Sequence, residues 1–355
     1  MPTPVRLSDL TTLRLGGPAP DLITATSAAE IADAVGSADR AGTGVLVLGG
    51  GSNLVVADQG IPMPIVRVGV PGIRLERDGS TGAAQVTVGA GEGWDEVVAE
   101  LTGQGFGELA ALSGIPGSTG ATPVQNVGAY GTEIARVLTA VTLYDRRTGE
   151  LRRVPAADLR LGYRSSALRG TDSAVIADIT MAVTTGPVTV RYAELARALG
   201  VHVGERAPAA AVREAVLDLR RAKGMVLDPD DPDTYSAGSF FTNPILDRDR
   251  ALQVDATIRS RLGLGISYPR YPDADTGEIK LSAAWLIERA GFGKGHQGPG
   301  GRVAVSGKHT LALTNRGGST ADLLVLAAEI RDGVRAAFGV TLHPEPLLIG
   351  VTLPD

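Results

Sequence analysis

The sequence predicts an α+β protein with two domains, on two observations. Short apolar runs of the kind that form strands alternate with helical segments in the first half of the chain, and helical patterns dominate after residue 190. The change falls between residues 188 and 208, so we predict domains at 1–190 and 205–355. With 355 residues, the chain is long enough to give each domain its own core.

The strands of the first half are predicted from short aliphatic and β-branched runs next to glycine-rich turns. Between them, Trp94 to Leu101 is expected to form a short helix that ends near Gly103. The predicted strands are 45–48, 54–56, 85–88, 137–144 and 174–183.

Helix signals mark the second half. They are clearest in the last helix, where Ser319 can act as the N-cap, Asp322 lies three residues later, and Gly339 ends the apolar periodicity. A final strand is expected to carry Pro344 and Glu345. Further helices are predicted at 193–199, 209–223 and 282–290.

Residues 228–233 form an acidic loop broken by prolines. Its four carboxylates could hold a divalent cation, but we favour a solvated turn. The four histidines, at positions 202, 296, 309 and 343, show no metal-ligand spacing, so no metal site is predicted.

Composition excludes several classes of protein. A net charge of −5 and a pI near 5.5 argue against general nucleic-acid binding. The absence of cysteine excludes disulfides, thiolate catalysis and iron–sulfur clusters. No apolar run approaches a membrane span of about 18 residues, and no signal-peptide core is evident, so we expect a cytoplasmic protein without a membrane partner.

The most informative segment is Gly114–Gly131, where two prolines fix the backbone and glycines permit close approaches that a Cβ would block. Its exposed N–H groups could wrap a pyrophosphate; a glycine-rich surface turn is the alternative. The dinucleotide fingerprint and the phosphate loop are both absent. A cofactor would therefore be held by several separated loops. The candidate loops are 49–53, 89–93 and 113–131.

The same segment resembles the flavin loop of the UDP-N-acetylenolpyruvoylglucosamine reductase (MurB) family. Further family-like blocks follow in the family's order and together cover nearly the whole chain. Two departures, Leu13 in place of an aromatic residue and Thr242 in place of a frequent lysine, touch no residue assigned to chemistry. The blocks are Thr12–Gly17, Leu48–Asn53, Val88–Trp94, Gly162–Ser166, Ala237–Pro244 and Pro344–Pro346.

The resemblance implies a two-subdomain FAD-binding fold of the vanillyl-alcohol-oxidase (PCMH) type, split near residue 70, followed by a C-terminal α+β substrate-binding domain. The last strand, about 340–352, is expected to return to the FAD domain. Because the chain lacks cysteine and the three loops lack histidine, the FAD should be non-covalent. The residues expected to bind it are Gly49, Gly50, Gly51, Ser52, Asn53, Gly114, Ile115, Pro116, Gly117, Ser118, Gly120, Ala121, Gln125, Asn126, Gly128, Ala129 and Tyr130.

Three residues are catalytic by resemblance, namely Arg164, Ser239 and Glu345. Without it, each has a plainer interpretation: a surface arginine, a strand edge and an edge-strand carboxylate between prolines. Ser239 would protonate the substrate carbon next to a carboxylate. Arg164 would stabilise the charge that develops on that carboxylate, and Glu345 would orient the acid group.

Six residues resemble the family's contacts to the sugar nucleotide. Lys223 could meet a phosphate, although its spacing alone favours a solvated helix end. Residues 188–200 around Tyr192 resemble the tyrosine-bearing loop of the family's longer type, and Tyr268 is an alternative to Tyr271; simple packing is the plainer interpretation of these tyrosines. The six are Tyr163, Tyr192, Lys223, Asn243, Tyr271 and Gln297.

The resemblance implies an FAD-dependent reductase that converts UDP-N-acetylglucosamine enolpyruvate to UDP-N-acetylmuramate, with NADPH as hydride donor, for peptidoglycan synthesis. A monomer is expected. Two alternatives stay open: another flavin-dependent oxidase or dehydrogenase of the same superfamily, and a non-catalytic module that binds flavin or a sugar nucleotide.

Overall fold

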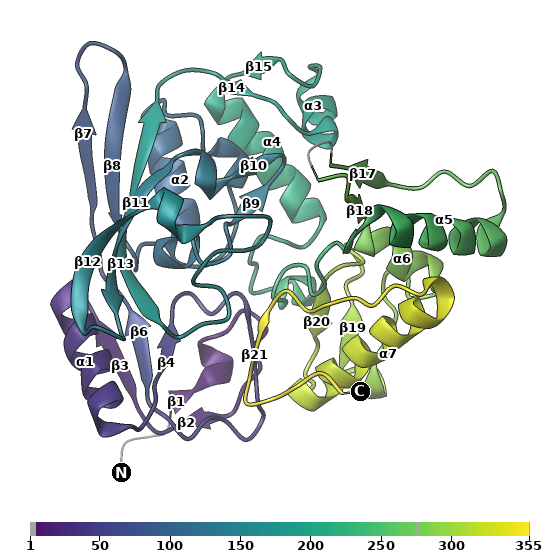
Figure 1. Cartoon of the computed structure of the whole chain (residues 1–355), viewed down its shortest axis with the longest axis horizontal. Coiled ribbons are helices and arrows are strands. Elements are labelled where there is room, and N and C mark those ends of the chain that lie inside the picture. The colour runs from purple at the N-terminus through teal and green to yellow at the C-terminus, as the bar shows by residue number, and fades with distance from the viewer. Residues whose placement is uncertain (1–4, 274–275, 355) are drawn as a thin grey trace. The chain divides into compact units, whose positions relative to one another are not determined.

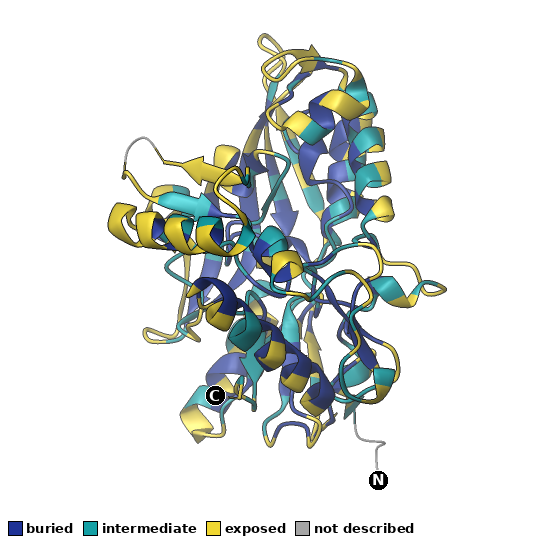
Figure 2. Cartoon of the chain, turned by 90° about the vertical axis from the view of Figure 1, so that its right-hand side faces the viewer, coloured by how far each residue is buried: buried dark blue, intermediate teal, exposed yellow. Residues whose placement is uncertain are grey.

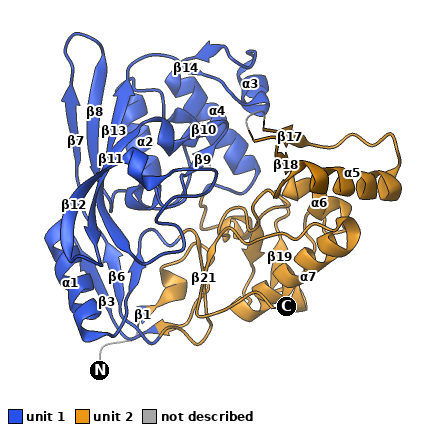
Figure 3. Ribbon diagram, viewed as in Figure 1, with its two compact units in different colours: residues 1–5, 19–51, 62–226 blue, residues 6–18, 52–61, 227–355 orange. Residues whose placement is uncertain are grey.

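The computed structural model describes residues 5–273 and 276–354. The chain forms two compact units, each built from several segments (Figure 3). Of the described residues, unit 1 holds Val5, 19–51 and 62–226, and unit 2 holds 6–18, 52–61, 227–273 and 276–354. Because each unit combines segments from different parts of the sequence, the two units do not correspond to the predicted domains 1–190 and 205–355. Those ranges stay a prediction, and their ends at 1–4 and 355 lie outside the described residues.

The two larger sheets of unit 1 differ in type (Figure 1). Helix α1 (Ala28–Ala41) follows the first of their strands. The strands are β3 (Leu22–Ala25), β4 (Leu46–Leu48), β6 (Ile65–Val68), β7 (Ile73–Arg77), β8 (Ala83–Gly89), β11 (Leu138–Asp145), β12 (Glu150–Pro155) and β13 (Ala174–Thr184). The first sheet is parallel, in the order β3-β6-β4. The second is antiparallel, in the order β12-β11-β13-β8-β7. Strand β6 belongs to the parallel sheet and the next strand, β7, to the antiparallel one.

One apolar cluster fills the core of unit 1 between the strands and two helices. It includes Ile31 and Val35 of α1, Val86 of β8 and Trp94 of α2 (Trp94–Gly103). The predicted helix and strands in this part of the chain are confirmed, with bounds that differ by a few residues. In β8 the buried residues Ala84, Val86 and Val88 alternate with more exposed ones, as expected of a strand with one face on the core.

Residues 188–222 form a smaller layer in unit 1 with a separate apolar cluster. Its elements are β14 (Val188–Thr189), α3 (Ala193–Leu199), β15 (Arg206–Ala207) and α4 (Ala209–Ala222). Both predicted helices are confirmed. Helix α3 ends because Gly200 takes a left-handed conformation, with φ of 68°. Unit 1 also contains the short strands β9 (Gly128–Ala129) and β10 (Thr132–Glu133).

Among its described residues, unit 2 packs three α-helices and short strands around its own core. These elements are β5 (Leu54–Val56), β16 (Ile245–Leu246), α5 (Arg248–Leu262), β17 (Arg270–Pro272), β18 (Ile279–Leu281), α6 (Ala283–Arg289), β19 (Val303–Val305), β20 (Leu313–Asn315), α7 (Thr320–Phe338) and β21 (Leu347–Ile349). β21 pairs in parallel with β5. The prediction that the final strand carries Pro344 and Glu345 was wrong, because the strand starts after the second proline, Pro346, which has no N–H to donate. The remaining strands are β1 (Val5–Arg6) and β2 (Pro18–Ala19).

Helix α7 begins and ends at the predicted residues. Ser319 and Asp322 form a reciprocal capping box, and Gly339 ends the helix in a left-handed conformation. Asp58 adds a second acceptor, which takes hydrogen bonds from the N–H groups of Thr320 and Ala321. In Figure 2 the helices are buried on one side and exposed on the other, as expected from the helical period of their apolar residues.

Candidate flavin and substrate site

Two of the three predicted cofactor loops are joined by backbone hydrogen bonds in unit 1. Thr119 N donates to Glu92 O at 2.8 Å, Gly120 N donates to Ala90 O at 2.9 Å, and Trp94 N donates to Gly117 O at 3.0 Å. The segment before helix α2 and the segment 117–120 therefore lie side by side.

The third predicted loop, 49–53, packs its glycines against the segment 117–118. A Cβ on Gly49 would lie 2.5 Å from Ser118 Oγ, and a Cβ on Gly50 would lie 2.5 Å from Gly117 Cα. A Cβ on Gly120 would lie 2.4 Å from the Cβ of Ala90. Gly50 faces backbone atoms and Gly120 faces the Cβ and Cα of Ala90, so a side chain at either position would push the segments apart, whereas at Gly49 the Ser118 hydroxyl can rotate away. The predicted loop is divided between units, since Ser52 and Asn53 belong to unit 2, where Asn53 O accepts from Leu347 N.

The loop 113–131 contains one buried polar side chain without a hydrogen-bond partner among the described residues and another whose hydrogen bonds are satisfied. Thr119 is fully buried, and within residues 5–273 and 276–354 its hydroxyl meets no hydrogen-bond partner. Asn126, in contrast, donates to Glu133 Oε2 and Gly162 O and accepts from Ala135 N. The Asn126 side chain thus ties the loop to the segment that precedes Arg164. Thr119 lies inside the segment Gly114–Gly131, and no local pattern in the sequence distinguishes it from its neighbours.

Arg164 lies against this loop within unit 1. Its φ of 48° is left-handed, and its Nη2 donates to Gly128 O at 2.7 Å. Its guanidinium carbon lies 5.5 Å from the centre of the Tyr163 ring. The half-buried guanidinium is therefore held beside a predicted cofactor segment, so the plainer interpretation of a surface arginine is not favoured.

Two predicted substrate residues meet the loop residue Tyr130. The ring centres of Tyr130 and Tyr192 are 5.7 Å apart in an edge-to-face contact, and Lys223 Nζ lies 5.8 Å from the Tyr130 ring centre. Lys223 also pairs with Glu194 at 2.6 Å. Burial raises the pKa of Tyr130 to about 12, so its hydroxyl stays protonated at neutral pH. This group combines an ammonium and two aromatic rings, which suits a polar anionic ligand.

Ser239 and Glu345 lie on adjacent segments of unit 2. Gly238 takes a left-handed conformation with φ of 72°, and Phe240 and Phe241 are almost fully buried. Glu345 N donates to Phe240 O at 2.8 Å, so the main chains of the two segments are paired. In the part of the chain that the structure describes, Ser239 Oγ has no hydrogen-bond partner. The hydroxyl is thus available for contact with a ligand.

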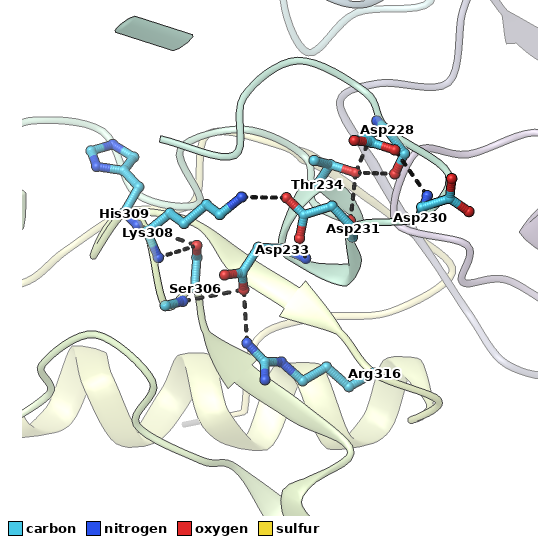
Figure 4. Close-up of polar contacts among 10 residues, drawn as sticks. Asp228, Asp230, Asp231, Asp233, Thr234, Ser306, Lys308, His309 and Arg316 are labelled. Atoms are coloured by element: carbon cyan, nitrogen blue, oxygen red, sulfur yellow. Dashed lines mark hydrogen bonds and ion pairs between the residues drawn. The ribbon is translucent and has the colours of Figure 1, made fainter. Parts of the chain in front are cut away.

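The acidic loop before Ser239 is held by cations from another segment (Figure 4). Lys308 Nζ lies 2.5 Å from Asp231 Oδ2, and Arg316 Nη2 lies 2.7 Å from Asp233 Oδ1. The hydrogen bond from Lys308 lowers the pKa of Asp231 below its usual value. Two of the four carboxylates thus pair with cations of the chain, and the described residues contain no group of histidine and carboxylate side chains suited to a metal ion.

Three other predicted substrate residues also lie in unit 2. Asn243 Oδ1 accepts from Ala283 N at the start of α6, and Gln297 is exposed. Tyr271 is 49% exposed. Tyr268, the alternative, stacks on Trp285 and donates to Asp255. Tyr268 is therefore engaged in packing, which favours Tyr271 as the ligand contact.

Comparison with known proteins agrees with this arrangement. A family model described as UDP-N-acetylenolpyruvoylglucosamine reductase, C-terminal domain, matches residues 230–349, and a model described as FAD binding domain matches residues 20–155. The UDP-N-acetylenolpyruvoylglucosamine reductase of Saccharopolyspora erythraea is 57% identical over 98% of this chain and 95% of its own length. The chain belongs to this reductase family. The family's enzyme from Thermobifida fusca is 51% identical, over 98% of both chains.

A solved structure of a family member supports the fold. The crystal structure of the reductase from Thermus caldophilus covers 98% of both chains with a TM-score of 0.63 at 24% identity. The predicted family and the two-part FAD-binding fold are therefore confirmed. Among the described residues, no helix is both long and apolar enough to cross a membrane.

Proposed function

We propose that the chain is an FAD-dependent reductase that uses NADPH to reduce UDP-N-acetylglucosamine enolpyruvate to UDP-N-acetylmuramate, a step in peptidoglycan precursor synthesis. The observation that carries this proposal is 57% identity to a named reductase over 98% of the chain. The matched FAD binding domain and the converging glycine loops support it.

The residues of the loops fit FAD. Glycines that cannot carry a side chain bring three backbone segments together, and the buried Thr119 hydroxyl has no protein partner among the described residues. Backbone N–H groups and a hydroxyl are suitable donors to a pyrophosphate or a flavin carbonyl. When bound, FAD supplies hydride transfer from NADPH to the enolpyruvyl group. The candidate contacts are the residues of 49–53 and 114–130 named above, with Thr119 added.

Three side chains would act on the substrate. The Arg164 guanidinium would stabilise the negative charge that collects on the substrate carboxylate. Glu345 would orient that acid group, and Ser239 Oγ would donate a proton to the adjacent carbon. The buried pair Phe240 and Phe241 would keep water from the Ser239 hydroxyl.

The sugar nucleotide would be held mainly by polar and aromatic side chains. Lys223 would exchange part of its contact with Glu194 for a phosphate of the substrate. Tyr192, which is 43% exposed, would cover the ligand. The full proposed set is Tyr163, Tyr192, Lys223, Asn243, Tyr271 and Gln297. A cytoplasmic monomer is the state proposed for this activity.

The test separates the two half-reactions in Ser239→Ala. NADPH should still bleach the visible absorbance of the bound flavin, because the hydroxyl takes no part in cofactor reduction. Product formation should fall by about 10²–10⁴-fold, the usual contribution of a general acid. Ser260→Ala, at an exposed position of α5, is the matched control. Turnover at the wild-type rate in Ser239→Ala would remove Ser239 from the mechanism.

The same assay decides between this function and the superfamily alternative. An oxidase would be reoxidised rapidly by air and would ignore the enolpyruvyl nucleotide. The proposed reductase should be reoxidised anaerobically as soon as that nucleotide is added. A binding module would consume no NADPH at all.

A further inference from the structure

Ser239 lies in the irregular segment between the acidic loop and β16, and one hairpin of unit 2 pairs with it. Ser239 forms an isolated antiparallel bridge with Ala312, and Phe240 N donates to Leu311 O at 2.7 Å. Both partners belong to the connection 306–312 between β19 and β20. The place of the Ser239 hydroxyl therefore depends on where this connection lies.

The acidic loop holds the same connection through Asp233 (Figure 4). Its Oδ1 accepts hydrogen bonds from Gly307 N at 3.2 Å and from Arg316 Nη2 at 2.7 Å. The Asp233 side chain is only 13% exposed, whereas that of Arg316 is 38% exposed. A charge-assisted contact is stronger where one of its groups is shielded from water. Asp233 thus ties the chain just before Ser239 to the connection that pairs with Ser239.

The connection is braced by its own hydrogen bonds. Ser306 is fully buried, and its Oγ accepts from Lys308 N at 3.0 Å and from His309 N at 3.2 Å. Ser306 N donates to Ala312 O at 2.8 Å, and Ala312 N donates to His309 O at 3.0 Å. Because these bonds join both ends of the connection, a displacement at Gly307 is passed on to Ala312.

Packing fixes the chain after Ser239 more firmly than the turn at Ser239 itself. Phe240 and Phe241 are almost fully buried in the core of unit 2. Gly238, in contrast, is left-handed with φ of 72°, and a Cβ on it would meet none of the described residues within 4 Å. Glycine has no side chain that could lock such a turn. The hydrogen bonds to the connection therefore limit how far the Ser239 hydroxyl can move.

We propose that Asp233 is a positioning residue for the proton donor. It holds the connection 306–312, and through it Ser239 Oγ, in the place from which the substrate carbon is protonated. The inference rests on the proposed function, in which Ser239 is the general acid. Because the Asp233 carboxylate is occupied by Gly307 and Arg316, it has no role in binding the cofactor or the nucleotide. Misplacing a reacting group by about 1 Å costs up to about 10²-fold in rate.

The test follows the two half-reactions in the Asp233→Ala holoenzyme. NADPH should bleach the flavin at the wild-type rate, whereas anaerobic reoxidation by saturating enolpyruvyl nucleotide should slow by about 10–10²-fold. The dissociation constant of the oxidised enzyme for the nucleotide should stay unchanged. Asp230→Ala is the matched control, because it removes an exposed carboxylate from the same loop, and it should keep both rates.

A displaced donor differs measurably from a general loss of structure. Displacement of Ser239 slows proton transfer alone, so the solvent deuterium isotope effect on reoxidation should be at least as large as in the wild type. A smaller isotope effect, an equal loss in both half-reactions, or reoxidation at the wild-type rate in Asp233→Ala would overturn the proposal.

Arg316 gives a second variant, so the test does not depend on the folding of Asp233→Ala. Arg316→Met removes the cation that holds the Asp233 carboxylate, and should slow reoxidation selectively but by less. Arg316→Lys keeps a cation there and should restore most of the rate. Equal rates in Arg316→Met and the wild type would contradict the inference.

Amide hydrogen exchange provides a check without any substrate. In Asp233→Ala, exchange should become faster at Phe240 N, which donates to the connection, while helix α7 keeps its protection. Unchanged exchange at Phe240 would overturn the inference whatever the substrate is. Faster exchange in a protein whose wild type does not reduce the enolpyruvyl nucleotide would count against the proposed function alone.

Discussion

Gly50→Ala should separate two of the cofactor loops. The new Cβ would lie 2.5 Å from Gly117 Cα and 2.9 Å from Ser118 N, whereas ordinary contacts are 3.4–4 Å. All the atoms that it meets are backbone, so no flexible side chain can move aside, and the two segments must part by about 1 Å.

The expected loss of stability follows from this overlap. Overpacking of a tight site costs about 1–3 kcal/mol, which corresponds to a fall in Tm of about 2–12 °C for a domain of roughly 200 residues. If the displaced segments also bind FAD, a loss of about 1.4 kcal/mol in binding weakens the affinity tenfold.

Thermal unfolding of the apoprotein and fluorescence titration with FAD measure the two effects separately. Gly103→Ala is the matched control, because a Cβ there meets nothing within 4 Å at an exposed helix end. It should leave both quantities unchanged or raise Tm slightly. A Gly50→Ala protein with wild-type Tm and wild-type FAD affinity would refute the claim that these loops pack backbone to backbone at the cofactor site.

Two further predictions concern unit 2. Asp58→Ala removes acceptors that take hydrogen bonds from Thr320 N at 2.8 Å and Ala321 N at 3.0 Å, so urea unfolding should show a loss of about 1–2 kcal/mol; an unchanged midpoint would contradict the capping role. Lys308→Met removes the ion pair that holds the pKa of Asp231 below its usual 3.8, and should cost about 0.2–1 kcal/mol near pH 7. Because the folded pKa is lowered, this contribution is present above pH 3.8 and is lost as the pH falls through the lowered value; a difference from wild type that persists at still lower pH would argue against the pair.

Local signals predicted most elements correctly. The capping residues Ser319 and Asp322 and the stop at Gly339 placed α7, and α3 was predicted with its observed bounds. These signals act over one or two helical turns, so they can be read without knowledge of the fold. The final strand was misplaced because it starts only after Pro346, which has no N–H to donate, and because its partner β5 lies far away in sequence.

Electrostatic neighbours could not be predicted in this way. The acidic loop appeared to be a solvated turn because Lys308 and Arg316 come to it from distant positions. Arg220 lies beside Arg221 and Lys223 at a basic helix end, and its burial is what distinguishes it from them. Burial and pairing depend on which distant segments pack together.

By itself, the sequence determined the family, the α+β class and the glycine-rich loops, because motifs and periodicity are properties of neighbouring residues. Only the tertiary structure decided which glycines touch another backbone, which carboxylates are already paired, and which arginine is buried. Those features arise when segments remote in sequence pack together and exclude water, so they cannot be predicted from a local sequence pattern.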